Sequence, residues 1–255
     1  EIELAGYSRN FAIYDTTDSR RLVKECIAGL GLDQKVYNPK GILRLISSFK
    51  NSGAGPEDLQ NEYRDNPRMK NIALVFAAYN RELKRANALD FDDIIGVTVK
   101  ILEENPQTRN YWMHRFSHIF VDEYQDTNTL QYKLVSLLRE KAENLCVVGD
   151  DDQSIYRFRG ATIENILRFE EQCPGATVVK LECNYRSTQT ILDAANHVIR
   201  NNAGRKDKTL WTENGKGDPI LLFHAYDENH EADFIASTIQ KMREEYGCNY
   251  SSFAV

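Results

Sequence analysis

Residues 118–153 read HIFVDEYQDTNTLQYKLVSLLREKAENLCVVGDDDQ. Two short, largely apolar runs, residues 118–121 and 145–148, lie on either side of a segment at 128–139. In that segment the apolar residues recur at helical spacing, whereas the flanking runs resemble strands that are buried on both faces. Strand, helix and strand in this order predict a parallel α/β sheet.

The same alternation continues toward the C-terminus. Further apolar runs occupy residues 177–181 and 220–223. Amphipathic helical segments occupy residues 162–171, 188–201 and 228–245. Pro174 and Gly175 predict a break between one sheet and a second. Parallel sheets bind ligands at the carboxyl ends of their strands, so the residues directly after each run are the candidates for chemistry.

The N-terminal part has a different pattern. Between residues 15 and 88 the apolar positions recur at helical spacing throughout. We predict that Asp18 caps the first helix, that Pro39 opens the second, and that residues 51–58 form a loop. This block contains no residues that suggest catalysis, so we expect an all-helical subdomain.

Composition limits the possible classes of protein. The chain has 255 residues, 42% of them hydrophobic and 27% charged, which is typical of a globular protein. A net charge of −6 argues against a partner held by bulk positive charge. The five cysteines form no C-x-x-C pair. This argues against a disulfide framework and against a zinc site, and it favours the reducing cytoplasm. No apolar stretch could span a membrane, and both ends look cut, so we expect a piece of a larger protein.

The first strand end carries two adjacent carboxylates, Asp122 and Glu123. Magnesium prefers oxygen ligands and is often held by one or two carboxylates plus substrate phosphates. A second carboxylate can then accept a proton from an attacking water. The pair is therefore typical of nucleotide hydrolysis, and the alternative is an acidic helix N-terminus that complements the helix dipole.

The second strand end leads into GDDDQSIYRFRG, residues 149–160. Gln153 suits a hydrogen bond to a terminal phosphate or to the attacking water. Tyr156 and Phe158 alternate with Arg157 and Arg159, and this combination suits single-stranded nucleic acid, because bases stack on aromatic rings and phosphates pair with guanidinium groups. The alternative is a core Phe beside an exposed turn.

The third strand end leads into CNYRST, residues 183–188. Tyr185 can stack on a base, Arg186 can reach a phosphate, and Ser187 or Thr188 can cap the helix that follows. The alternative is a capped helix with a surface Arg. Three such strand ends in chain order favour phosphate and base chemistry more than any one of them does.

These three segments resemble a known family. VDEYQDTN (121–128), VVGDDDQSIYRFRGA (147–161) and LECNYRSTQTILDAAN (181–196) resemble motifs II, III and IV of superfamily 1 DNA helicases of the UvrD/PcrA/Rep type, and ALDFDD (88–93) resembles the return from their helical insertion. The resemblance implies partial RecA-like (P-loop NTPase) motor domains with parallel sheets and an inserted helical subdomain. It assigns residues 1–14 to a remnant of the first motor domain, 15–88 to the insertion, 89–176 to the second part of the first motor domain, and 177–255 to the start of the second motor domain.

The resemblance also implies roles for residues of the first motor domain. Asp122 would bind Mg²⁺, and Glu123 would be the general base that activates water. Gln125 would join this loop to its neighbour beside the nucleotide. Gln153 would sense the γ-phosphate of ATP, and Arg159 would link the DNA-contacting loop to the nucleotide site.

For DNA and the second motor domain, the resemblance implies five further assignments. Tyr156, Arg157 and Phe158 would lie along single-stranded DNA. The family usually has Trp at the position of Phe158, so we expect a weaker base contact there. Tyr185 would stack near the adenine, and Arg186 would reach the γ-phosphate.

Taken together, the resemblance implies an ATP-dependent 3′-to-5′ DNA helicase in repair or replication restart, with ATP and Mg²⁺ as cofactors. Its partners would be single-stranded DNA, single-strand/double-strand junctions and repair proteins, in the nucleoid and away from membranes. The sequence contains no G-x-x-x-x-G-K-[ST] loop, and motifs V and VI with their arginine finger would lie beyond Val255. We therefore expect this chain alone to be inactive.

Three other functions remain open from the sequence. They are the helicase subunit of a helicase–nuclease, a non-catalytic DNA-binding module of the same fold, and a Mg²⁺-dependent phosphohydrolase unrelated to DNA. The intact acidic pair and the aromatic–arginine stretch favour the helicase.

Several other residue groups receive structural interpretations. His114 and His118 have the spacing of metal ligands on one helix face, but the sequence offers no partner to complete a site. We expect Asp90 to cap a helix, with Asp92 and Asp93 bordering the motor cleft. The basic residues Arg205, Lys206 and Lys208 predict a solvated loop or a phosphate contact. Trp112 and Trp211 are interpreted as packing residues.

Overall fold

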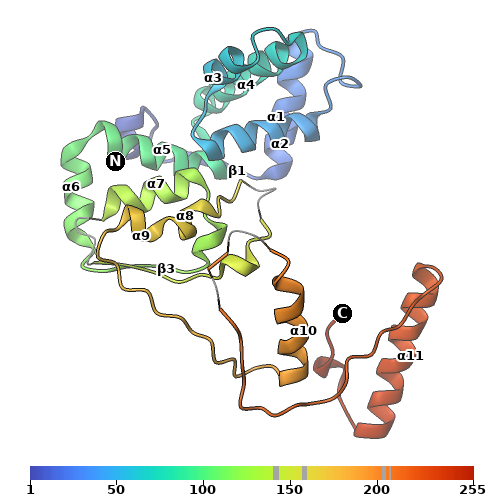
Figure 1. Cartoon of the computed structure of the whole chain (residues 1–255). Coiled ribbons are helices and arrows are strands. Elements are labelled where there is room, and N and C mark those ends of the chain that lie inside the picture. Colours follow the sequence, from blue (N-terminus) through green and yellow to red (C-terminus); the bar gives the residue numbers. More distant parts are fainter. Residues whose placement is uncertain (140–143, 157–159, 203–204, 207) are drawn as a thin grey trace. The chain divides into compact units, whose positions relative to one another are not determined.

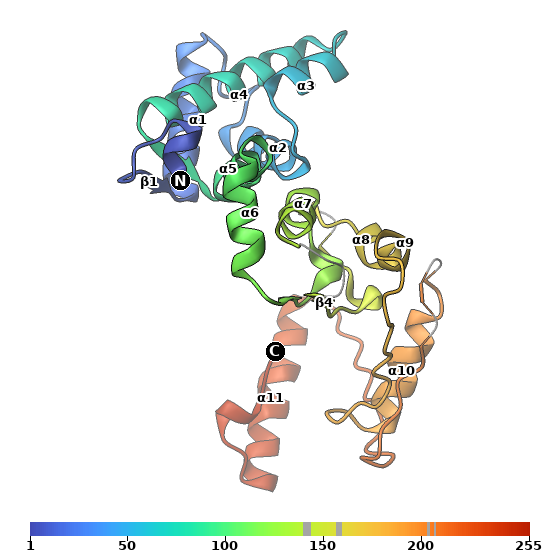
Figure 2. The same ribbon diagram turned by 90° about the vertical axis from the view of Figure 1, so that its left-hand side faces the viewer.

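The computed structural model describes residues 1–139, 144–156, 160–202, 205–206 and 208–255 (Figures 1 and 2). The chain forms two compact units. The first contains Glu1–Val179 together with Asn202–Asp207, and the second contains Lys180–Asn201 together with Lys208–Val255. The second unit is therefore interrupted by a six-residue segment that belongs to the first.

Four helices form the blue-to-cyan part of the first unit in Figure 1: α1 (Thr16–Gly29), α2 (Pro39–Ser52), α3 (Pro56–Glu62) and α4 (Pro67–Arg85). Their apolar faces enclose one core, in which Ile27, Ile46, Phe76 and Tyr79 are almost fully buried. α2, α3 and α4 each begin with proline, whose fixed φ suits the first helical turn. The helices expected here are confirmed.

Two local predictions in this block are wrong. The N-cap of α1 is Asp15 rather than Asp18, because Asp15 Oδ1 accepts from the backbone N–H groups of Thr17 and Asp18 at 2.7 and 2.8 Å. The loop predicted at 51–58 is shorter, since α2 continues to Ser52 and α3 begins at Pro56. The end of α2 is set by Gly53, whose φ of 80° favours glycine.

Among its described residues, the first unit contains two pairs of parallel strands. β1 (Ala12–Tyr14) pairs with β2 (Ala88–Asp90), so the chain enters and leaves the four-helix block through neighbouring strands. β3 (Ile119–Val121) pairs with β4 (Leu145–Val147), with Ile119 opposite Leu145 and Val121 opposite Val147. The parallel pairing predicted from residues 118–153 is confirmed.

Helices accompany these strands in the first unit. They are α5 (Phe91–Glu104), α6 (Pro106–Arg115), α7 (Thr129–Leu138), α8 (Glu164–Leu167) and α9 (Phe169–Gln172), with 3-10 turns at Ile2–Ala5, Tyr124–Asp126 and Asp151–Gln153. α5 packs against both α6 and α7. The helix predicted at 162–171 is divided, because Arg168 leaves the helical conformation between α8 and α9.

The second unit contains α10 (Gln189–Ile199), α11 (Glu228–Tyr246) and a 3-10 turn at Tyr250–Ser252. The strands predicted at 177–181 and 220–223 are wrong: the structure describes these residues and assigns none of them to a strand. Val179 and Leu222 are 74% and 91% exposed, so neither run has the covering layer that a buried strand needs. An isolated bridge joins Cys183 to Trp211, which is 46% exposed.

No helix in the described ranges combines the length and apolar composition that a bilayer span requires.

Candidate functional site

Asp122 and Glu123 lie directly after β3. Val148 donates its backbone N–H to Val121 O at 2.8 Å, and Tyr124 N–H donates to Val148 O at 2.9 Å, so backbone hydrogen bonds hold the chain on both sides of the pair. Glu123 has the left-handed conformation (φ 49°, ψ 41°), which turns the chain sharply. Both acidic side chains are exposed, so water and a hydrated cation can reach them.

Tyr124 anchors this turn in the protein interior. Its ring is 1% exposed and meets the edge of Phe169 at a centroid distance of 5.8 Å. Burial raises the pKa of Tyr124 to about 12, so its hydroxyl is neutral at physiological pH. Because this side chain is fixed in the core, the preceding carboxylates are displayed at the surface by a rigid support.

Gln125 joins the loop after β3 to the loop after β4. Its buried side chain donates from Nε2 to Glu123 Oε2 at 2.7 Å and accepts at Oε1 from the backbone N–H of Asp150 at 2.9 Å. One amide therefore fixes the Glu123 carboxylate relative to the neighbouring loop. This geometry suits the linking role expected for Gln125.

Gln153 ends the short turn that follows β4. Its backbone N–H donates to Asp150 O at 3.0 Å, and its Nε2 donates to Asp150 Oδ2 at 2.7 Å. Glu123, Gln125, Asp150 and Gln153 consequently form a continuous hydrogen-bonded series across the ends of β3 and β4. The structure thus brings together four of the predicted site residues: Asp122, Glu123, Gln125 and Gln153.

The acidic triplet Asp150–Asp152 has carboxylate oxygens within 4.8 Å of one another. Two of these carboxylates, those of Asp151 and Asp152, bind the segment of chain that returns to the first unit. Arg205 donates from Nε and Nη2 to the two carboxylate oxygens of Asp152 at 2.9 and 2.8 Å, and its side chain is 13% exposed. Lys206 donates its backbone N–H to Asp151 Oδ2 at 2.7 Å, and its Nζ pairs with Glu170.

The solvated-loop interpretation of the basic cluster is wrong for Arg205 and Lys206, because they bind the acidic turn that ends at Gln153. The alternative interpretation, a phosphate contact, stays a prediction. A guanidinium that pairs with a carboxylate through two parallel hydrogen bonds is strongly oriented. Arg205 thus fixes the orientation of the Asp152 carboxylate in this turn.

The expected DNA-contacting stretch is described in part. Tyr156 is 37% exposed and lies just after the turn. Arg157, Phe158 and Arg159 lie outside the described residues, so their assignments stay predictions. The chain is described again at Gly160, and the next residue, Ala161, pairs with Asn128 in an antiparallel bridge.

Tyr185 and Arg186 belong to the second unit. Tyr185 is 84% exposed, and the side chain of Arg186 is also exposed. Asn184 Oδ1 accepts from the backbone N–H groups of Arg186 and Ser187 at 3.0 and 2.7 Å, which fixes the turn before α10. Thr188 occupies the N-cap position of α10 without a capping hydrogen bond from its side chain.

Comparison with known families shows two consecutive matches. Residues 1–174 match the UvrD/REP helicase N-terminal domain, and residues 179–255 match the UvrD-like helicase C-terminal domain. The chain belongs to the UvrD/REP helicase family. The domains of this family are RecA-like, in agreement with the mixed helix and strand content and the parallel strand pairs of this chain.

Curated relatives support this membership. An ATP-dependent DNA helicase PcrA from Leuconostoc citreum is 48% identical over 253 residues, covering 99% of this chain and 34% of that protein. Proteins of the same name from Staphylococcus epidermidis strain RP62A and Staphylococcus aureus strain Mu50 are each 46% identical over 250 residues, covering 98% of this chain and 34% of each protein. The chain therefore spans about a third of the length of the curated relatives it matches.

Gly149 is closely surrounded in this member of the UvrD/REP family. A Cβ placed there would lie 2.5 Å from Gln125 Oε1, 2.8 Å from Ile166 Cδ1 and 3.2 Å from the backbone N of Tyr124. The glycine thus lets the two site loops approach each other.

We predict that Gly149→Ala lowers the free energy of unfolding by about 1–3 kcal/mol, because the methyl group displaces Gln125 or Ile166. Urea denaturation measures this change. Gly41→Ala is the matched control, since no atom outside the adjacent backbone of α2 lies within 4 Å of its Cβ position and α2 gains helix propensity. Equal stabilities of the two variants would contradict the close approach at Gly149.

A buried ion-pair cluster joins α2 to the start of α5. Lys50 Nζ is 2.7 Å from Asp90 Oδ2 and 2.7 Å from Asp93 Oδ1, and the Tyr79 hydroxyl donates to Asp90 Oδ2 at 2.8 Å. Burial opposes the charge of Asp90, but the ammonium group of Lys50 holds the pKa of Asp90 below its ordinary value. Burial raises the pKa of Asp93 above its ordinary value.

The cluster confirms that Asp90 is the N-cap of α5, since its Oδ1 accepts from Asp93 N–H at 2.8 Å. Asp92 and Asp93 bind Asn51 and Lys50 of α2. Their expected place at the border of the motor cleft stays a prediction. The buried position of Lys50 could have been predicted from the sequence, because Lys50 follows Ile42 and Ile46 at four-residue steps on the buried face of α2.

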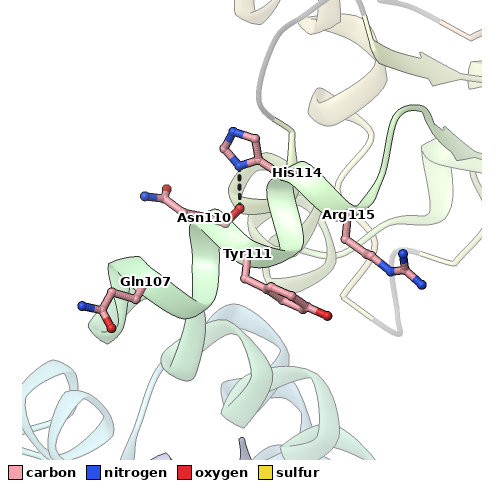
Figure 3. Close-up of a pocket in the computed structure, with 5 residues that line it drawn as sticks. All are labelled: Gln107, Asn110, Tyr111, His114 and Arg115. Atoms are coloured by element: carbon pink, nitrogen blue, oxygen red, sulfur yellow. Dashed lines mark hydrogen bonds between the residues drawn. The ribbon is translucent and has the colours of Figure 1, made fainter.

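α6 presents a shallow surface hollow lined by Gln107, Asn110, Tyr111, His114 and Arg115 (Figure 3). These five side chains come from one face of a single helix. His114 Nδ1 lies 2.7 Å from Asn110 O, and His118 lies beyond the end of α6 at Arg115. The two histidines therefore do not share a helix face, and the hollow contains none of the residues expected in the site.

Proposed function

We propose that this chain is the central part of an ATP-dependent DNA helicase that moves 3′ to 5′ along single-stranded DNA in repair or replication restart. Residues 1–14 and 89–176 would belong to the first motor domain, residues 15–88 to its helical insertion, and residues 177–255 to the second motor domain. The protein would act in the cytoplasm at the nucleoid.

The observation that carries this proposal is the position of Gln125 between Glu123 and the loop of Gln153. A general base must be held in a fixed orientation toward the water that it activates. Gln125 binds Oε2 of Glu123, and Oε1 would accept from the attacking water. Gln153, on the same hydrogen-bonded series, would contact the γ-phosphate or the attacking water.

The residues after β3 also suit a magnesium ion. Asp122 accepts at Oδ1 from the backbone N–H of Glu123 at 2.9 Å, and its exposed carboxylate has a second oxygen for a cation. Asp122 would therefore hold Mg²⁺, with water and phosphate oxygens as the remaining ligands. The ion would neutralise phosphate charge, while Glu123 would accept the proton of the attacking water.

The remaining roles rest on exposure and residue type. Tyr156, with Arg157 and Phe158, would contact single-stranded DNA by stacking and by phosphate pairing. Tyr185 and Arg186 are exposed and would contact the adenine and the γ-phosphate from the second motor domain. Arg159 would connect the DNA-contacting stretch to the nucleotide. Single-strand/double-strand junctions and repair proteins would be the partners of the full-length protein.

The test uses the full-length protein. ATP turnover is measured with Mg²⁺, with and without single-stranded DNA, and we expect DNA to stimulate it. Direction is measured by displacement of streptavidin from oligonucleotides biotinylated at one end, and movement from 3′ to 5′ displaces it from the 5′ end. Absence of DNA-stimulated turnover would refute the helicase proposal and favour a DNA-binding module, whereas displacement only from the 3′ end would refute the direction.

A further inference from the structure

The turn that carries Gln153 is bound by Arg205, which lies 53 positions after Asp152 in the chain. The guanidinium of Arg205 donates from Nε to Asp152 Oδ1 at 2.9 Å and from Nη2 to Asp152 Oδ2 at 2.8 Å. The two side chains are 13% and 9% exposed, so salt screens the pair less than it would a pair at the surface. Because both N–H groups are aligned with one planar carboxylate, the pair fixes the orientation of Asp152 as well as its distance from Arg205.

Asp152 is joined to Gln153 through the carboxylate of Asp150. The backbone N–H of Asp152 donates to Asp150 Oδ1 at 2.9 Å, and Gln153 Nε2 donates to Asp150 Oδ2 at 2.7 Å. The two oxygens of one carboxylate thus bind the backbone of Asp152 and the side chain of Gln153. A rotation of residue 152 would turn this carboxylate and carry the amide of Gln153 with it.

Lys206 binds the neighbouring residue of the same turn. Its backbone N–H donates to Asp151 Oδ2 at 2.7 Å, and its Nζ pairs with Glu170 of α9. Two successive residues, Arg205 and Lys206, therefore bind two successive residues of the turn. The contact of Lys206 with Asp151 comes from the backbone, so Arg205 is the residue whose side chain can be exchanged to test this attachment.

We propose that Arg205 is a positioning residue that holds Gln153, through Asp152 and the carboxylate of Asp150, in the orientation required for ATP turnover. The inference rests on the proposed function, in which Gln153 contacts the γ-phosphate or the attacking water. In this role Arg205 acts on turnover through Gln153, whereas a phosphate contact would make it act on nucleotide binding directly. A misplacement of about 1 Å in a reacting group can cost on the order of 10²-fold in rate, so a residue that only orients Gln153 can alter kcat.

The test is a double-mutant cycle between Arg205 and Gln153 in the full-length protein. Arg205→Gln should lower kcat for DNA-stimulated ATP turnover on the order of tenfold and change KM for ATP by less than about threefold. Gln153→Ala should lower kcat by itself, because it removes the group that is positioned. In the Gln153→Ala background, Arg205→Gln should change kcat by less than about twofold, since residues that act as a unit are not additive. Single-turnover measurements with enzyme in excess keep the slow variants measurable.

Further variants separate positioning from charge and from folding. Arg21→Gln makes the same change at an exposed position of α1, where Arg21 pairs with Glu25 at 3.2 Å, and it should keep the wild-type kcat. Asp152→Ala removes the carboxylate that Arg205 binds, so Arg205→Gln should add little to its effect. Melting temperatures are recorded for every variant. If Arg205→Gln fails to fold, Arg205→Lys takes its place in the cycle, since lysine keeps the charge but lacks the planar fork that binds both oxygens.

The outcomes are distinct. A fall in kcat that disappears in the Gln153→Ala background supports the positioning role, because a loss of folded protein would lower turnover equally in both backgrounds. A wild-type kcat in folded Arg205→Gln or Gln153→Ala overturns the inference, and so does an equal fall in both backgrounds. A rise in KM for ATP without a fall in kcat overturns it in favour of a phosphate contact by Arg205. Absence of DNA-stimulated turnover in the wild type refutes the proposed function instead.

Discussion

Replacing Glu123 by Gln in the full-length protein will lower DNA-stimulated ATP turnover by roughly 10²–10⁴-fold, the usual effect of removing a general base. Gln has nearly the size of Glu and keeps an oxygen for the hydrogen bond from Gln125 Nε2, so the loops after β3 and β4 retain their arrangement. Its neutral amide cannot accept the proton of the attacking water. Steady-state turnover measures the loss, and equilibrium titration with a fluorescent ATP analogue measures binding, which should persist.

The matched control is Glu104→Gln at the end of α5. Glu104 forms an exposed pair with Lys100 at 3.9 Å, and such surface pairs contribute little free energy. Its turnover should equal that of the wild type. Full turnover in Glu123→Gln would show that another group accepts the proton, and the assignment of Glu123 would then be wrong.

Replacing Lys50 by Met will lower the free energy of unfolding by about 3–5 kcal/mol, because it leaves two buried carboxylates without their cation. The side chains of Asp90 and Asp93 are 8% and 18% exposed, so water cannot replace the ammonium group. Met preserves most of the side-chain volume, which separates the loss of charge from the loss of packing. Urea denaturation at neutral pH measures the effect, and Lys100→Met, whose side chain is 63% exposed, is the control.

The same variant should show a changed dependence on pH. In the wild type the pKa of Asp90 is lowered, so its contribution to stability is present above the ordinary value of about 3.9 and is lost as the pH falls; the raised pKa of Asp93 acts in the opposite sense. Without Lys50, both carboxyl pKa values rise, and protonation relieves the cost of burying them. The stability difference from the wild type should therefore shrink between about pH 7 and pH 4. A difference that stays constant or grows over this interval would contradict the ion-pair explanation.

The parts of the fold that could be predicted are those whose signal is local. β3, α7 and β4 follow from apolar runs on either side of a helical pattern, and each lies within about two residues of its expected place. The runs at 177–181 and 220–223 have the same composition but form no strand. A strand needs a hydrogen-bonded neighbour, and this requirement cannot be read from the apolar run itself.

The candidate site divides in the same way. Asp122, Glu123 and Gln153 follow strand ends, so topology alone brings them to one edge. Contacts between side chains far apart in the chain produce no periodic pattern in the sequence. For this reason the sequence did not predict the contact of Asn51 with Asn128 or that of Arg205 with Asp152. Each of these polar residues had many chemically equivalent partners, and only the folded backbone selects among them.

The segment Asn202–Asp207 affects which recombinants between related genes can encode a stable protein. Arg205 pairs with Asp152 of the first unit, yet it is encoded after the second family match has begun at residue 179. A crossover between the two matches, at residues 175–178, would bring Arg205 from one parent and Asp152 from the other. Chimeras of two relatives should therefore fold only when the parents carry compatible residues at positions 152 and 205. The boundary between the two family matches is consequently not a point at which the gene can be exchanged freely.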